Sequence, residues 1–429
     1  MRPLNPPSGP AMNALTIIFI IALTVSAVLR VWLTDRQIMY VGRHRNTVPE
    51  AFSTSIEPAA HCKAADYAIA KSRFSLIGLA LDLVLALLWT IGGGLALLDG
   101  AWRHVGINLL NTGVLVIASY VLINALIELP LSVFSTFGIE ARFGFNRTRI
   151  KTYVLDLLKL MLLAAILGVP LVYAALWIMS RSGQLWWLYV WVLWLSFSLV
   201  LTWAYPVLIA PLFNKFSPLA DAALKQRIES LLQRCGFTSR GVFVMDGSTR
   251  SAHGNAYFTG FGRNKRIVFF DTLMDKLMPE EIEAVLAHEL GHFRLKHVLQ
   301  RLAVTAVLSL VGLAILGWLA GSDWFYHGLG VSQTSDYMAL LLFTLLAPPF
   351  LLLLEPFSSV WSRRHEFQAD AYASRHTQAT ALIHALVKLY RDNATTLTPD
   401  PLYSAFHDSH PSALTRIARL KKLAGTLPP

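Results

Sequence analysis

The chain has 429 residues, of which 55% are hydrophobic and 15% are charged. A soluble protein of this length divides into two or three domains built from amphipathic elements, and the long apolar runs of this sequence exclude that class. The net charge of +11 would suggest nucleic-acid binding in a soluble protein. Here the basic residues collect in alternate loops, so we expect no nucleic-acid partner.

Seven apolar runs are long enough to cross a bilayer as helices, which takes about 18 or more such residues. They cover about residues 12–33, 75–98, 105–127, 154–180, 185–212, 302–320 and 337–354. The first run is long and only Arg2 precedes it, which is atypical of a cleavable signal, so we expect it to remain as a helix. The sequence therefore predicts a multi-pass α-helical protein embedded in a lipid bilayer.

The distribution of Lys and Arg predicts the side of the membrane on which each loop lies. If residue 1 lies outside, the inner segments hold 34 of the 37 basic residues. These inner segments are about 30–73, 129–159, 213–301 and 361–429. The positive-inside rule places them on the cytoplasmic side. Cys62 and Cys235 fall within them, so no disulfide is expected in that reducing compartment.

Residues 213–301 form the longest polar stretch. SPLADAALKQRIESLLQRCGF predicts an amphipathic helix, and GVFVMDG predicts a short strand. HGNAYFTGFGRNKRIVFFDTLM predicts two strands joined by a turn at Gly262–Lys265. MPEEIEAVLAHELGHFRLKHVL then predicts a helix with Pro279 in its first turn. This order is typical of a small zinc-peptidase domain.

Residues 361–429 are again polar and mostly helical, so the catalytic part of the chain is expected to be split. We expect four segments: 1–212 with five membrane helices, 213–301 with the catalytic HExxH motif, 302–360 with two membrane helices, and 361–429 with a third metal ligand.

The HExxH motif consists of His288, Glu289 and His292. On a helix the two histidines are one turn apart and can bind one metal ion, while Glu289 can face a water on that ion. The alternative is a coincidental pair of surface histidines. The extended zinc motif with a third histidine fails, because His297 is one residue short of the required position. His297 is interpreted as a helix-end residue and not as a ligand.

Catalytic zinc usually has three protein ligands, so a carboxylate from elsewhere is expected to complete the site. Glu355 and Glu366 are the two candidates, and Glu366 is preferred. Asp370 follows Glu366 on the same helix face and suits a carboxylate that orients a ligating histidine. The alternative is that Glu366 and Asp370 form a solvated acidic face beside Arg363 and Arg364.

At this point the sequence resembles the integral-membrane zinc CAAX prenyl endopeptidases of type I. HELGH, SRRHEFQADAYA, SAHGNAYFTGFGRNKRIVFFDTL and SHPSALTRI resemble motifs of that family, as do FGIEARFGFNRTRIKTYVLDLLK and PLFNKFSPL. The matches run from about residue 130 to 425. The resemblance implies seven long helices around an intramembrane chamber, with a small α+β zincin-like catalytic domain at the cytoplasmic end.

The resemblance also implies roles for particular residues. The implied ligands of one Zn²⁺ per chain are His288, His292 and Glu366. The implied catalytic residues are Glu289 as general base, Asp370 beside the ligands, and His410 and Arg416 near the scissile carbonyl. The implied substrate-binding edge is Asn255, Ala256 and Tyr257. Position 365 departs from the family, since it is His where relatives often carry an aromatic residue.

Elementary chemistry supports the same roles and leaves open which residue stabilises the oxyanion. A hydrogen-bond donor must hold the oxyanion that develops on the carbonyl, and His410 and Tyr403 are both candidates. Arg416 either joins them or fixes a carboxylate near the metal.

The predicted function is a membrane zinc metalloendopeptidase, with prenylated CAAX C-termini as the family substrate. One alternative is a bacterial quality-control protease of the same fold, and another is a non-catalytic transporter or channel with a vestigial zinc site. A site-2-type protease fits poorly, because the turn PEEIEA carries three glutamates and would lie in hydrocarbon. We expect a monomer in a bacterial inner membrane, or in the endoplasmic reticulum if the organism is eukaryotic, with the active site on the cytoplasmic side.

Overall fold

The computed structural model describes residues 13–238, 241–259 and 266–426. Within these residues, seven helical segments are long and apolar enough to cross a membrane. Four of them are α1 (Ala14–Arg43), α2 (Pro58–Trp89), α4 (Leu109–Val133) continued by η2 (Phe134–Glu140), and α5 (Ile150–Arg181). The fifth runs through η3 (Gly183–Leu185), α6 (Trp186–Ala204), η4 (Tyr205–Ile209) and α7 (Ala210–Phe213). The last two are α11 (His297–Leu319) and α13 (Asp336–Leu351), which continues through η6 (Leu352–Leu354) into α14 (Glu355–His376).

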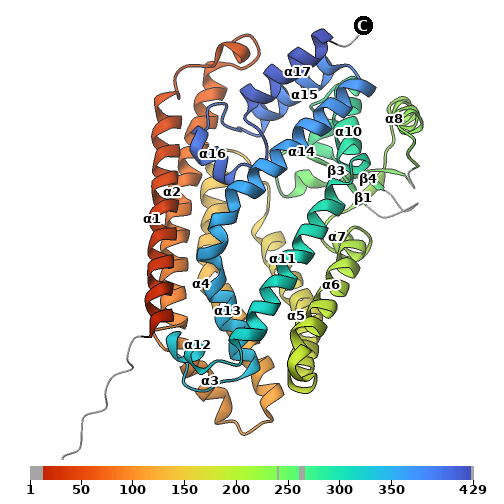
Figure 1. The fold of residues 1–429 in the computed structure, drawn as a ribbon. Coiled ribbons are helices and arrows are strands. Elements are labelled where there is room, and N and C mark those ends of the chain that lie inside the picture. Colours follow the sequence, from red (N-terminus) through yellow and green to blue (C-terminus); the bar gives the residue numbers. More distant parts are fainter. Residues whose placement is uncertain (1–12, 239–240, 260–265, 427–429) are drawn as a thin grey trace, which may run out of the picture.

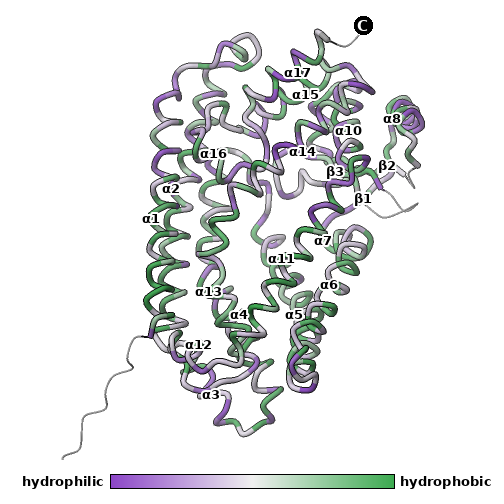
Figure 2. The backbone as a smooth tube through the Cα atoms, in the orientation of Figure 1, coloured by the Kyte–Doolittle hydropathy of each residue, from purple (hydrophilic) through white to green (hydrophobic). Residues whose placement is uncertain are grey.

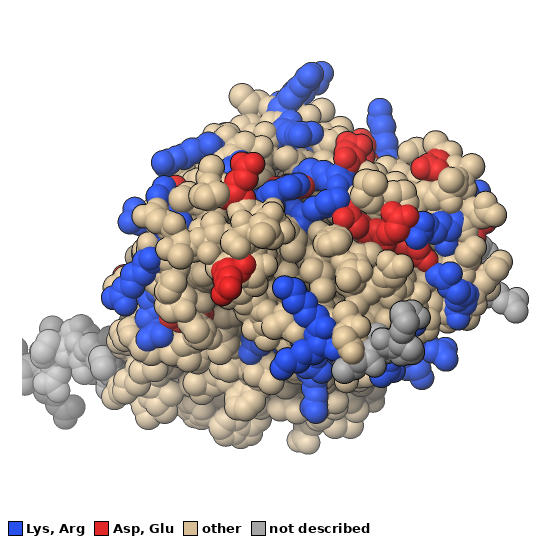
Figure 3. All heavy atoms as spheres, turned by 90° about the horizontal axis from the view of Figure 1, so that it is seen from above, with Lys and Arg blue, Asp and Glu red and all other residues tan. Residues whose placement is uncertain are grey.

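Apolar residues of these helices form one end of the molecule, and polar residues gather at the other end, where the C-terminus lies (Figures 1 and 2). Large apolar side chains are exposed along the helices, among them Ile21, Leu162 and Trp318. Exposed apolar surface on this scale indicates contact with lipid. Seen from the polar end, Lys and Arg side chains are spread over the surface (Figure 3). The prediction of a multi-pass α-helical membrane protein is confirmed.

The second span differs from its expected range of 75–98. Helix α2 begins at Pro58 and ends at Trp89, and the short helix α3 (Gly94–Arg103) follows. The break falls at consecutive glycines, where Gly93 has φ +79 and a Cβ on Gly92 would lie 2.9 Å from the Leu88 carbonyl oxygen. Only glycine fits this turn without strain. The apolar run continued through the turn, so hydropathy alone placed the span too late in the chain.

A cavity of about 590 Å³ lies among α1, α2, α4 and α13. Ionisable and amide side chains line part of it, including Arg30, Asp82, Asn124 and Glu128. Polar residues within a membrane bundle normally face its interior rather than lipid. The bundle therefore contains a partly polar cavity.

The polar end contains a four-stranded sheet in the order β1-β2-β4-β3. Its strands are β1 (Phe216–Pro218), β2 (Val242–Met245), β3 (Ala256–Thr259) and β4 (Arg266–Phe270). The expected pair is the antiparallel β3 and β4, while the turn predicted at Gly262–Lys265 lies outside the described residues. The sequence did not predict β1, which occupies Pro218 before the N-cap Asp221 opens α8 (Ala222–Arg234).

Helices cover one face of the sheet and form the main core of the polar end. They are α8, α10 (Pro279–Arg294), α15 (Ala379–Asp392) and α17 (Ala413–Thr426), and Ile228, Phe269, Leu290 and Leu382 are buried between them. The shorter elements are η1 (Glu50–Phe52), η5 (Gly247–Thr249), α9 (Asp271–Met274), α12 (Asp323–Gly328) and α16 (Pro401–His407).

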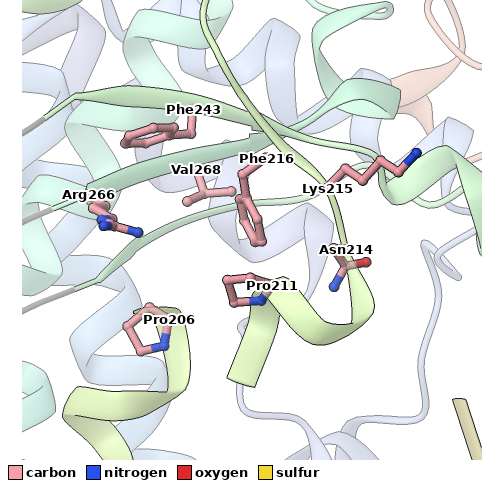
Figure 4. Close-up of a pocket in the computed structure, with 8 residues that line it drawn as sticks. All are labelled: Pro206, Pro211, Asn214, Lys215, Phe216, Phe243, Arg266 and Val268. Atoms are coloured by element: carbon pink, nitrogen blue, oxygen red, sulfur yellow. The ribbon is translucent and has the colours of Figure 1, made fainter. Parts of the chain in front are cut away.

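The other face of the sheet lies over the end of the fifth span. A cavity of about 500 Å³ separates them, with Phe243 and Val268 of the sheet on one side and Pro206 and Pro211 on the other (Figure 4). An ion pair links the two parts of the molecule beside this cavity: Arg250 binds Asp156 of α5 through two contacts of 2.8 and 3.1 Å. These contacts connect the catalytic end to the membrane helices.

Candidate metal centre

Helix α10 carries the HExxH motif and is fixed at its start. Pro279 occupies the first turn, and the Glu281 carboxylate accepts the Met278 backbone N–H at 2.8 Å. Glu281 also binds Lys388 of α15 at 2.7 Å. Because the helix lies between α8, α14 and α15, its residues from Glu281 to His288 are all buried. The helix is therefore enclosed on all sides, and His288 and His292 lie on the side that faces Glu366 of α14.

Gly291 explains how α10 and α14 come so close together. A Cβ at this position would lie 3.0 Å from Ala369 Cα and 3.0 Å from Tyr372 Cβ, both on α14. Any larger side chain would push the two helices apart. The glycine inside HELGH is therefore a packing requirement between the helix with two histidines and the helix with Glu366.

His288, His292 and Glu366 form the one group of potential metal ligands found among the described residues. The two Nε2 atoms are 3.2 Å apart, and the nearest Glu366 oxygens lie 3.5 Å from His288 Nε2 and 3.3 Å from His292 Nε2. Tetrahedral zinc with bonds of about 2.0–2.2 Å separates its ligand atoms by about 3.3–3.6 Å. The three side chains thus fit a tetrahedral metal ion with its fourth position open.

A buried ion pair holds His288. Asp370 Oδ1 lies 2.9 Å from His288 Nδ1, and Arg416 binds both Asp370 oxygens at 2.7 and 2.8 Å. Arg416 Nη2 also lies 3.2 Å from His288 Nδ1, but both groups are donors, so the carboxylate is what receives the imidazole proton. Burial acts to lower the pKa of Arg416, but Asp370 outweighs it and the pKa lies above its usual value.

Neutral groups hold His292. Its Nδ1 is hydrogen-bonded to His297 Nδ1 at 3.0 Å, and His297 Nε2 bonds Gln368 Oε1 at 3.0 Å. The His365 ring stacks on His297 with centroids 3.9 Å apart, and its Nε2 bonds Gln300 Oε1 at 3.1 Å.

Sequence reasoning left His297 out of the ligand set and missed its contact with His292. Lys296 has a left-handed backbone conformation, with φ +58, and separates α10 from α11. The chain turns at this residue, which brings His297 into contact with His292. The +5 spacing from His292 was the only available signal.

The ligands open into a cavity of about 260 Å³. Glu289, Phe258, Ser409 and His410 also line it. Glu289 is half-buried, and no ion pair or hydrogen bond engages its carboxylate among the described residues. The His410 side chain is 65% exposed, and its Nδ1 lies 2.8 Å from Glu366 Oε2. Glu289 and His410 therefore reach the cavity from different elements.

The other candidates do not line the cavity of the ligands. Glu355 binds Arg30 at 2.6 Å and lies 3.6 Å from His407, so it belongs to the membrane boundary and not to the metal cluster. Tyr403 lies on α16 with its ring 4.6 Å from that of His407. Arg416 is buried against Asp370, and of its two predicted roles the geometry favours the one that fixes a carboxylate.

The predicted substrate edge lies on β3, the last strand in the sheet order. Asn255 is exposed and its carbonyl oxygen accepts the Phe270 N–H at 3.0 Å, while Ala256 and Tyr257 pair with Phe269 and Val268. The opposite edge of β3 pairs with no described strand. Phe258 of the same strand lines the cavity of the ligands, so β3 borders that cavity.

Comparison with known proteins agrees with this geometry. Residues 37–215 match the family model "CAAX prenyl protease N-terminal, five membrane helices", and residues 218–424 match "Peptidase family M48". CAAX prenyl protease 1 of Saccharomyces cerevisiae is 33% identical, with 91% of each chain covered, and the Arabidopsis thaliana homologue is 41% identical over 68% of this chain and 69% of its own.

A solved structure is similar over nearly the whole chain. The crystal structure of S. mikatae Ste24p superposes with a TM-score of 0.87 at 30% identity and covers 96% of this chain and 100% of its own. These matches span both the membrane bundle and the catalytic end, and they do not favour a transporter or a site-2-type protease. The chain belongs to peptidase family M48, in its CAAX prenyl protease branch, and is a membrane-embedded metallopeptidase.

Proposed function

We propose that this protein is a zinc endopeptidase that cleaves prenylated C-terminal CAAX peptides. The observation that carries the proposal is the triangle of His288, His292 and Glu366, which has the spacing of tetrahedral zinc and lies beside Glu289 in one cavity. Relatives named CAAX prenyl protease 1 support this substrate class. The partly polar cavity lies among helices of the membrane bundle, and such a position suits a substrate with a lipid anchor.

His288, His292 and Glu366 would hold one Zn²⁺ through two nitrogens and a carboxylate oxygen, a donor set used by catalytic zinc. When bound, zinc supplies a Lewis acid that polarises the scissile carbonyl and acidifies water. Asp370, held by Arg416, keeps the proton of His288 on Nδ1, which would leave Nε2 unprotonated and able to bind the ion.

The remaining residues handle the substrate and the protons. Glu289 accepts the proton of the attacking water and passes it to the leaving amine nitrogen. His410 donates a hydrogen bond to the oxyanion, since it lines the cavity. The peptide adds as a strand along Asn255, Ala256 and Tyr257, because that edge of β3 is available for backbone hydrogen bonds.

We further propose that the polar end faces the cytoplasm, which the excess of Lys and Arg at that end supports. The segments 213–301 and 361–429 then act together as the catalytic part, and 1–212 and 302–360 as the membrane part. A monomer, and a bacterial inner membrane with the endoplasmic reticulum as alternative, stay predictions.

The first test combines zinc stoichiometry with cleavage of two peptides. Glu289→Ala should bind zinc at one ion per chain and lose cleavage of a farnesylated CAAX peptide, because only the proton carrier is removed. Retained cleavage would contradict the mechanism.

A plain unfolded peptide is the substrate control. If the wild-type protein cleaves it as fast as the farnesylated CAAX peptide, the substrate proposal fails and the quality-control alternative takes its place.

A further inference from the structure

The segment that carries His410 has little structure of its own. Helix α16 ends at His407 and α17 begins at Ala413, so His410 lies in the connection 408–412. Its side chain is mostly exposed, and Nδ1 lies 2.8 Å from Glu366 Oε2 of the metal cluster. Something outside this connection must fix its position, because exposed connections of this kind are mobile by default.

Helix α14 supplies that anchor through Arg363. Its Nη1 donates to the Ser404 carbonyl oxygen at 2.9 Å and to the Asp408 carbonyl oxygen at 2.8 Å. Its Nη2 lies 3.4 Å from the Ala405 carbonyl oxygen. One guanidinium thus serves three backbone acceptors at the end of α16, where the last carbonyls of a helix lack intrahelical partners; Ser404 in addition accepts the Asp408 N–H at 3.1 Å.

Ser359, one turn earlier on α14, adds a fourth bond. Its hydroxyl donates to the Phe406 carbonyl oxygen at 2.7 Å. Ser359, Arg363 and Glu366 are spaced by four and three residues, so they share one side of the helix. Helix α14, which carries Glu366, therefore also holds the end of α16. The distance between His410 and Glu366 then depends on α14 and on its hydrogen bonds to the end of α16.

We infer that Arg363 is a positioning residue for His410. This inference rests on the proposed function, in which His410 donates a hydrogen bond to the oxyanion. Arg363 touches neither a metal ligand nor the cavity, and it acts by holding the backbone of 404–408. The structure also separates it from its neighbour, since Arg364 is exposed and makes none of these bonds.

The expected consequence is a loss of rate without a loss of metal. A displacement of about 1 Å at a reacting group can cost about 100-fold in rate. Arg363→Met should therefore lower kcat by about 10- to 100-fold, leave KM for the farnesylated peptide little changed, and retain one zinc per chain. Arg363→Lys should recover part of the rate, because an ammonium still donates but cannot reach three acceptors at once.

A double-mutant cycle provides the test. The variants are R363M, H410A and R363M/H410A, with R364M as the matched control and R363K as a check on folding. If Arg363 acts through His410, R363M should lower kcat in the wild-type background and cost nothing in the H410A background. R364M should match the wild-type protein.

Four results would overturn the inference. The first is an unchanged kcat in R363M, and the second is a loss of kcat by the same factor in both backgrounds, which would indicate a general structural role. If instead H410A alone has no effect on kcat, the proposed role of His410 fails, and the inference fails with it. Loss of zinc from R363M and R363K alike would show that Arg363 supports the metal cluster and not His410.

Discussion

The two histidine ligands lie one turn apart on the same helix, yet opposite kinds of chemistry hold them. His288 contacts Asp370 and Arg416, which form the carboxylate side of the centre. His292 contacts a chain of neutral groups, His297 and Gln368, with His365 stacked behind them, which form the imidazole side. Removing one partner of a buried ion pair leaves an unpaired buried charge and costs much stability. Removing one residue from a chain of neutral hydrogen bonds costs less. The two sides should therefore respond differently to substitution.

The largest effect is expected on the carboxylate side. Arg416→Met leaves the buried Asp370 without its cation and should cost about 3–5 kcal/mol of stability. It should also weaken zinc binding, because Asp370 orients His288. Thermal unfolding in detergent and chelator competition measure the two effects. R416M/D370N is the informative control: with no stranded charge, part of the stability should return, and a double variant less stable than R416M would contradict this account.

A smaller and more selective effect is expected on the imidazole side. His297→Ala removes the acceptor for His292 Nδ1 and should lower zinc affinity about 10- to 100-fold, with a smaller change in thermal unfolding than R416M. The matched control is His376→Ala, because that ring bonds the Tyr372 backbone on the same helix as Glu366. If H297A binds zinc as tightly as the wild-type protein, the imidazole side does not orient its ligand.

The smallest effect is expected for the outer layer of the imidazole side. His365→Phe keeps a ring stacked on His297 and should change zinc affinity by less than about threefold, whereas His365→Ala loses a stacking contact of about 0.5–1.5 kcal/mol. Chelator competition on both variants separates the stacking from the bond to Gln300. Equal losses for H365F and H365A would show that the hydrogen bond, which both variants lack, matters and that the stacked ring does not.

The sequence predicted the membrane class and the seven spans because those signals are local. A long apolar run has one stable outcome in a chain of this composition. The same locality explains the error at the second span, where hydropathy continued through a turn that Gly93 imposes. Strand β1 was missed because three residues carry too little pattern to distinguish a strand from a helix start.

For the site, the sequence could provide spacing on one helix and little about contacts between helices. Helical periodicity was enough to bring His288 and His292 together, and the shortage of ligands pointed to a distant carboxylate. The structure brings Glu366 to them, while the roles of all these residues stay predictions. The contributions of Gly291, His297 and Arg363 depend on how α14 crosses α10 and α16, which periodicity within one helix does not specify.

The two ligand-bearing helices run directly into separate membrane spans. Helix α10 passes through Lys296 into α11, and α14 continues from α13 with only η6 between them. The three potential ligands therefore lie at the polar ends of two long helical segments, and the other ends of these segments are membrane spans. A change in the tilt of either segment would alter the distances between the two histidines and Glu366. Because the hydrophobic thickness of the bilayer influences helix tilt, we expect it to influence the geometry of the metal site as well.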